Sequence, residues 1–262
     1  MKFLHVLSAS RNLSATVMFF SILSCSTLAF AAHPLVTDDA GTSGKGKAQL
    51  ELNGEYGHDK DAGVTSKTIG GAASVTYGLT ESLDLVAGVP YLHVRNMEDA
   101  TSSTENGLSD ISLEMKWRFY EHEDLSLAIK PGLTLPTGDE EKGLGAGKAA
   151  YSLFFIASKE LAPWAFHLNL GYIRNENTLD EGKNIWHASL ASTLAISDQL
   201  TIVANLGIES NPDKLAGTDP AFILGGLVYA LSETVDLDCG IKYGLNDPET
   251  DYTLLAGLTL KF

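Results

Sequence analysis

Apolar and polar residues alternate along most of the chain, and its last eleven residues illustrate the pattern. One face of this segment carries only apolar residues, and the other carries polar or small residues with Leu255 as the exception. A period of two is typical of a β-strand. A strand of about nine to eleven residues crosses a bilayer when it is tilted. The apolar face comprises Tyr252, Leu254, Ala256, Leu258, Leu260 and Phe262.

The alternation repeats in twelve segments and predicts twelve strands. Single-chain bacterial barrels have an even number of strands. Pro131 lies inside one segment and predicts a bulge or bend, because proline cannot donate a ladder hydrogen bond. Segment 222–231 is apolar on both faces. The predicted strands are 48–56, 69–77, 83–91, 110–119, 125–135, 151–158, 164–172, 186–196, 200–209, 222–231, 235–243 and 252–262.

The connections between these segments alternate in length: every second one is short, and the others are mostly longer. Short periplasmic turns and longer extracellular loops are the pattern of a transmembrane barrel. The crossovers of a β-sandwich would break that rhythm. Tyr and Trp lie near strand ends, as in the two aromatic girdles of a membrane barrel. We therefore expect an all-β protein, a transmembrane antiparallel up-and-down β-barrel of about twelve strands, in the bacterial outer membrane. The longer links are 57–67, 95–107, 136–148, 175–183, 210–219 and 246–251.

The N-terminal part divides into two segments before the barrel. Residues 1–32 have two positive charges, an apolar stretch and the small-residue pattern Ala29-Phe30-Ala31, which predict a cleaved signal peptide. Residues 33–47 are polar and glycine-rich, and we expect them either to stay in the periplasm or to fold into the lumen as a partial plug. Residues 48–262 form the predicted barrel. Cys25 leaves with the signal peptide, so Cys239 has no partner for an intramolecular disulfide.

The charge argues against nucleic acid as a partner. The formal net charge is −15, and loss of Lys2 and Arg11 with the signal peptide makes it −17. Binding to phosphate backbones needs a basic surface instead. The expected partners are outer-membrane lipids, a small solute, and the barrel assembly machinery, which would bind the C-terminal strand.

The polar face of the predicted strands should line the lumen. Charges there are tolerated when they are hydrated or paired. They either form a polar pathway that shapes selectivity or a hydrogen-bonded network that keeps the barrel rigid, and the second interpretation is favoured for any single residue. The candidates are Glu51, Glu55, Asp84, Asp110, Glu114, Lys116, Arg118, Lys130, His167, His187, Asp236, Asp238 and Lys242.

Other motifs give no catalytic, cofactor or metal site. The loop Gly143–Lys148 lacks the Gly-Lys-Ser/Thr of a phosphate-binding loop. The histidines lack the spacing of a metal site. His167 and His187 could meet near Ser189, but no neighbouring carboxylate is evident to orient a histidine for hydrolysis. No enzymatic activity is therefore expected.

Five stretches resemble the outer-membrane family named for the MetA pathway of phenol degradation. They are 33–42 (HPLVTDDAGT), 108–119 (LSDISLEMKWRF), 135–147 (LPTGDEEKGLGAG), 166–172 (FHLNLGY) and 236–244 (DLDCGIKYG). Asn205 departs from the pattern, where the family would have an acidic residue. The resemblance implies passive uptake or efflux and does not identify the solute. We expect a channel for small molecules, a class that could include aromatic or hydrophobic compounds. The alternatives are an outer-membrane lipid-modifying enzyme and a structural or soluble periplasmic β-protein.

Overall fold

The computed structural model describes residues 33–61, 63–98 and 101–262. The predicted signal peptide at 1–32 lies outside the described residues. The described chain forms thirteen strands and one short 3-10 helix, η1 (Glu140–Lys142). Among the described residues, no helix is long and apolar enough to cross a membrane. The strands are β1 (Ala48–Asp61), β2 (Val64–Thr80), β3 (Leu83–Glu98), β4 (Thr101–Leu108), β5 (Ile111–His122), β6 (Leu125–Leu135), β7 (Ala150–Leu161), β8 (Trp164–Arg174), β9 (Asn184–Ala195), β10 (Leu200–Glu209), β11 (Ala221–Ser232), β12 (Val235–Gly244) and β13 (Tyr252–Lys261).

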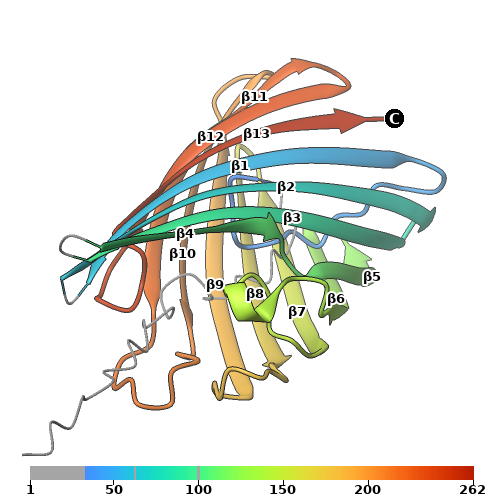
Figure 1. Cartoon of the computed structure of the whole chain (residues 1–262). Coiled ribbons are helices and arrows are strands. Elements are labelled where there is room, and N and C mark those ends of the chain that lie inside the picture. Colours follow the sequence, from blue (N-terminus) through green and yellow to red (C-terminus); the bar gives the residue numbers. More distant parts are fainter. Residues whose placement is uncertain (1–32, 62, 99–100) are drawn as a thin grey trace, which may run out of the picture.

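The sheet closes on itself because β1 pairs with β2 on one side and with β13 on the other (Figure 1). The last strand therefore meets the first, with Leu52 opposite Leu258. β4 pairs with the Tyr91–Glu98 half of β3, and β5 pairs with the Leu83–Gly88 half. β4 thus extends a hairpin, and the other twelve strands form the wall. The predicted twelve-stranded antiparallel barrel is confirmed.

Two of the predicted extracellular loops are largely strand. Segment 57–67 belongs mostly to the β1–β2 hairpin, and segment 95–107 belongs mostly to the β3–β4 hairpin. Both segments are rich in polar residues, so apolar alternation gives no signal there. Backbone hydrogen bonds between the paired strands continue these hairpins beyond the apolar part of the wall.

The sequence predicted a bulge or bend at Pro131, and no bulge is present there. Pro131 stays in register with Leu153 of β7. The register of β5 and β6 shifts elsewhere, between Arg118 and Tyr120 of β5. A proline removes one donor from a ladder, and here the strand tolerates that loss without an extra residue.

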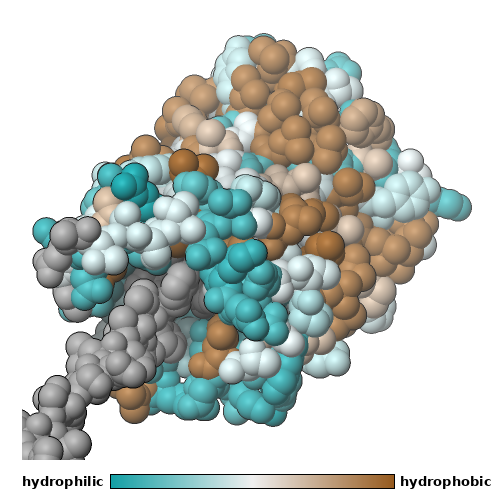
Figure 2. Space-filling model, in the orientation of Figure 1, coloured by the Kyte–Doolittle hydropathy of each residue, from teal (hydrophilic) through white to brown (hydrophobic). Residues whose placement is uncertain are grey.

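The outer face of the wall is apolar, and the inner face is mostly polar. In β8, Trp164, Phe166 and Leu168 are 37–44% exposed, whereas the intervening His167 is 7% exposed. Figure 2 shows apolar side chains gathered over the wall and polar ones toward the left and lower end, where longer loops lie. A soluble protein rarely exposes so continuous an apolar surface, whereas a bilayer covers it.

Residues His33–Lys47 are here called the leader, and most of this segment lies inside the barrel (Figure 1, blue), with Lys45, Gly46 and Lys47 exposed at its end. Ala40 is 0% and Leu35 is 8% exposed. Leu35 packs in one apolar cluster and Ala40 in another, each built mainly from inward side chains of the wall. The leader therefore gives the barrel an internal core, with its chain entering β1 at Ala48.

Candidate functional site

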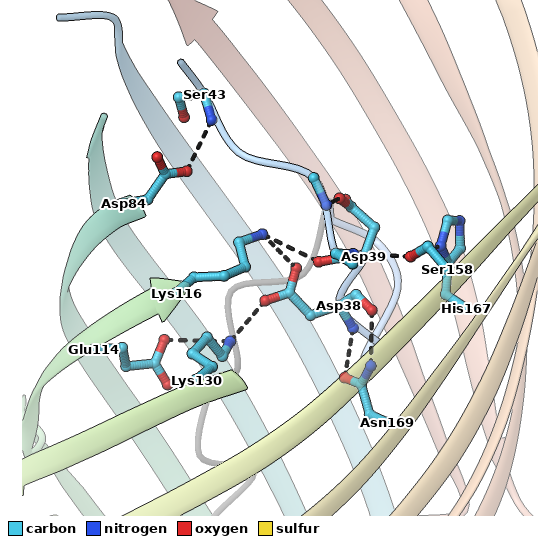
Figure 3. A network of polar contacts seen from close by, with 12 residues as sticks. Asp38, Asp39, Ser43, Asp84, Glu114, Lys116, Lys130, Ser158, His167 and Asn169 are labelled. Carbon is cyan, nitrogen blue, oxygen red and sulfur yellow. Dashed lines mark hydrogen bonds and ion pairs between the residues drawn. The ribbon is translucent and has the colours of Figure 1, made fainter. Parts of the chain in front are cut away.

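Asp38 of the leader is the centre of a buried ion-pair network. Its two carboxylate oxygens accept hydrogen bonds from Lys116 Nζ at 3.0 Å and from Lys130 Nζ at 2.8 Å. Lys130 Nζ also lies 3.4 Å from Glu114 Oε2. Figure 3 shows the two lysines reaching from β5 and β6 toward Asp38. Two carboxylates and two lysines balance, which is what such deeply buried charges require.

Asn205 of β10 holds the backbone of the leader. Its Oδ1 accepts from the N–H of Val36 at 2.8 Å and from the N–H of Thr37 at 3.0 Å. Its Nδ2 donates to Thr37 Oγ1 at 2.7 Å and to the Leu190 carbonyl at 2.9 Å. A carboxylate could accept the first two bonds but could not donate the others. This explains structurally why an amide, and not an acid, stands at this position.

Two further inward side chains, Asn169 of β8 and Ser158 of β7, bind residues of the leader that follow Thr37 in the sequence. Asn169 accepts from the N–H of Asp38 and donates to its carbonyl, both at 2.8 Å. Ser158 Oγ accepts from the N–H of Ala40 at 2.8 Å and lies 2.9 Å from His167 Nδ1. Together with Asn205, these side chains of the wall satisfy the backbone N–H groups of Val36, Thr37, Asp38 and Ala40 and the carbonyl of Asp38.

Strand β11 is apolar on both faces because its inward side chains pack against the leader. Phe222 and Leu224 point inward and pack with Leu35, together with Val203 of β10. Leu255, the exception on the polar face of β13, packs against the same cluster. Inward apolar residues in a polar lumen are thus a signal that something apolar is docked there.

The structure places the predicted lumen residues in distinct surroundings. Glu114, Lys116 and Lys130 join Asp38, and Asp238 pairs with His33. Arg118 Nη2 donates to the Glu81 carbonyl at 3.0 Å near the barrel end, while Glu55 lies beside Gly70. The remaining pairs are Asp236 with Lys261 at 2.5 Å, Lys242 with Glu249 at 2.9 Å, Glu51 with Gln49 at 2.6 Å, and Asp84 with the Ser43 N–H at 2.8 Å.

Asp110 orders an outer loop. Its two oxygens accept from the N–H of Gly138 and of Ala146, both at 2.8 Å. A Cβ on Gly145 would lie 2.4 Å from Asp110 Oδ1, so this close approach requires glycine. The glycine-rich loop folds inward and leaves Leu144 only 1% exposed.

His187 forms a contact set that the sequence did not reveal. Its Nε2 lies 2.9 Å from Ser189 Oγ, and its Nδ1 lies 3.0 Å from Glu209 Oε2. Glu209 supplies the orienting carboxylate that we did not expect, because it lies on β10, opposite His187 in the register. His167 pairs with Ser158 instead. Thr37 of the leader donates to Ser189 Oγ at 2.8 Å, and Ser189 is only 3% exposed.

The cavities lined by the described residues include two that lie beside the leader. One, of about 310 Å³, lies toward the periplasmic end among Glu51, Asp84 and Lys261. The other, of about 100 Å³, lies toward the extracellular end among the apolar side chains of Leu35, Leu92 and Leu255 and the glycines of β1 and β2. His33 lines both. The leader therefore divides the lumen into an acidic compartment and a mostly apolar one.

The described residues contain no group of three or more His, Cys, Asp or Glu side chains arranged to hold a metal ion. None of the curated proteins compared with the chain matches it significantly.

The fold is similar to that of several solved outer-membrane barrels. The KdgM porin matches with a TM-score of 0.58 and 8% identity, over 82% of this chain and 99% of the porin. The NanC porin matches with a TM-score of 0.56 and 11% identity, over 81% and 100%. The translocator domain of the autotransporter NalP from Neisseria meningitidis matches with a TM-score of 0.51 and 14% identity, over 84% and 89%. At such identities the likeness shows the fold alone.

The model of one protein family matches residues 34–262, which include the leader from Pro34 on and the whole barrel. The matched region thus contains both parts of the lumenal site, the docked segment and the wall that binds it. The chain belongs to the family described as "Putative MetA-pathway of phenol degradation".

Proposed function

We propose that this protein is an outer-membrane channel through which small molecules cross passively, with the leader narrowing the path. The observation that carries the proposal is a closed barrel whose docked leader leaves a cavity toward each end. Solutes would pass between these cavities around the leader or after it shifts. Such a shift would break the hydrogen bonds and ion pairs that hold the leader, and water would have to replace them.

The apolar cavity suggests which solutes are accepted. Its volume of about 100 Å³ and its Leu35, Leu92 and Leu255 lining suit a compact apolar or aromatic molecule. An engineered apolar cavity of about 150 Å³ binds benzene, so the scale is that of a single ring. The family description refers to phenol, which agrees with this class of solute. Exit through the wall beside the glycines of β1 and β2 is a further part of the proposal.

Flux measurements on purified protein in liposomes test this function. We expect the protein to accelerate entry of phenol relative to protein-free liposomes and relative to a disaccharide. A matched variant, Leu92→Trp, should fill the apolar cavity and reduce phenol entry without changing barrel assembly. Equal phenol entry with and without protein would refute the channel.

Hydrolysis at Ser189 is a second candidate function, favoured by its distances to His187 and by Glu209. A serine that is hydrogen-bonded to a histidine, which is in turn hydrogen-bonded to a carboxylate, can act as a nucleophile. Thr37 covers the serine, however, so the leader would have to leave before a substrate could reach it. Labelling of Ser189 by a fluorophosphonate probe would support hydrolysis. The channel requires no such rearrangement for solutes to enter either cavity.

A further inference from the structure

The periplasmic cavity carries more negative charge than its lining compensates. Two lysines, Lys116 and Lys261, and one histidine, His33, face a larger number of acids. The six acids outnumber the two lysines of the lining by four. The acids are Asp38, Asp39, Glu51, Asp84, Asp236 and Asp238.

Three of these acids have a buried side-chain oxygen without a hydrogen-bond partner among the described residues: Asp84, Glu51 and Asp236, whose other oxygen pairs with Lys261. Asp84 is 1% exposed and Glu51 is 3% exposed. Asp84 Oδ2 accepts from the Ser43 N–H, but Oδ1 has no hydrogen-bond partner among the described residues. Glu51 Oε1 accepts from Gln49, and Oε2 is likewise without a partner in the described part of the chain. Buried acceptor oxygens normally have hydrogen-bond partners, so both oxygens are available to accept hydrogen bonds from a ligand.

Cationic side chains of the protein do not supply that donor. Lys116 points to Asp38 and to the Asp39 carbonyl, and Lys261 points to Asp236. Within the described residues, no Lys, Arg or His nitrogen lies within 4.0 Å of a carboxylate oxygen of Asp84 or Glu51. The cavity between them has room for a molecule, at about 310 Å³.

We propose that this cavity binds a small organic cation whose ammonium groups donate to Asp84 Oδ1 and Glu51 Oε2. An ammonium carries three donors and a positive charge, which are what the two carboxylates lack. A bare metal ion fits less well, because no three acidic or histidine side chains in the described residues converge on one point. An anion would meet unfavourable charge. This binding site goes beyond the channel function and does not depend on passage through the barrel.

Titration calorimetry with 1,4-diaminobutane and the full mature protein in detergent tests the site. We expect saturable binding of one diamine and no binding of 1,4-butanediol, which has the same chain length without charge. Asp84→Asn and Glu51→Gln should each weaken diamine binding by about tenfold or more, because each removes one buried charged partner. The Asn oxygen can still accept from the Ser43 N–H, so Asp84→Asn should fold.

Asp198→Asn is the matched control. It makes the same charge change in the short turn between β9 and β10, outside the cavity lining. This variant should bind the diamine within about twofold of the unaltered protein. A heat-modifiable gel shift verifies that each variant is a folded barrel. The proposal is overturned by absent diamine binding, by equal binding of the diol, by tighter binding of Mg²⁺ alone, or by equal weakening in the Asp198→Asn control.

Discussion

Asp38 and Asp84 are both about 1% exposed, yet their surroundings differ. Asp38 binds two lysines, which hold the leader across the lumen. Asp84 binds one backbone N–H of the leader and leaves an oxygen without a partner among the described residues. A compensated buried carboxylate fixes a structure, whereas an uncompensated one is available to a ligand. Asp38 is therefore the anchor of the leader, whereas Asp84 lines the cavity beside the leader.

The largest expected effect comes from breaking the anchor. Asp38→Asn leaves Lys116 and Lys130 without their shared carboxylate, and removal of one partner from a buried ion pair costs about 3–5 kcal/mol. We expect the leader to be released more often. Hydrogen exchange of the 33–47 peptide, followed by mass spectrometry, measures the free energy of this release.

Asp39→Asn is the control for the anchor. The Asp39 carboxylate accepts from the Gly41 N–H and has no lysine partner at ion-pair distance in the described structure. Its loss should change leader exchange by less than about 0.5 kcal/mol. Similar acceleration by both substitutions would contradict the assigned role of Asp38.

Leu35→Ala tests the apolar part of the leader and should have the next largest effect. It removes contacts with Phe222 and Leu224 and leaves a void in their cluster. Buried Leu→Ala changes cost about 2–5 kcal/mol. Exchange should rise in the leader while the amides of β8 stay protected. Uniform loss of protection throughout the barrel would show that Leu35 supports the wall and not only the docked segment.

Asn205→Ala should have a smaller effect on leader release, about 1–3 kcal/mol, because it leaves the N–H groups of Val36 and Thr37 without their acceptor. Asn205→Asp keeps those two acceptor contacts but cannot donate to Thr37 Oγ1. The same exchange measurement should therefore place Asp between Asn and Ala. If the Asp variant released the leader more than the Ala variant, buried charge would outweigh the hydrogen bonds.

The smallest effect concerns Glu181 in an outer loop. Burial raises the pKa of Glu181, while a hydrogen bond from Asn175 opposes the rise. Its stabilising contribution is therefore complete below the ordinary pKa of about 4.5 and is lost as pH rises through the raised value. Glu181→Gln should remove this pH dependence from the exchange of loop 175–183.

Glu176 provides a control of opposite sign for that loop. Hydrogen bonds from Lys183 and Arg174 lower the pKa of Glu176. Its contribution is present above the ordinary pKa and is lost as pH falls through the lowered value. Glu176→Gln should thus weaken the loop at neutral pH. The same pH profile for both variants would refute the two assignments.

The wall of the barrel could be predicted from the sequence because bilayer contact imposes a strict period of two. The polar hairpin extensions could not, since no apolar contact marks their faces. The docking of the leader was left open, although inward Phe222 and Leu255 carried a signal of an internal apolar partner. The pairing of His187 with Glu209 required the register of β9 and β10, which alternation alone does not determine.

Single-channel conductance in planar bilayers tests the central claim most directly, that the docked leader restricts the lumen. The unaltered protein is compared with a variant that lacks residues 33–47 and assembles as a heat-modifiable barrel. Our account predicts a clearly larger conductance for the shortened variant, with Asp38→Asn showing transient openings to that level. The same conductance in the unaltered and shortened proteins would contradict it.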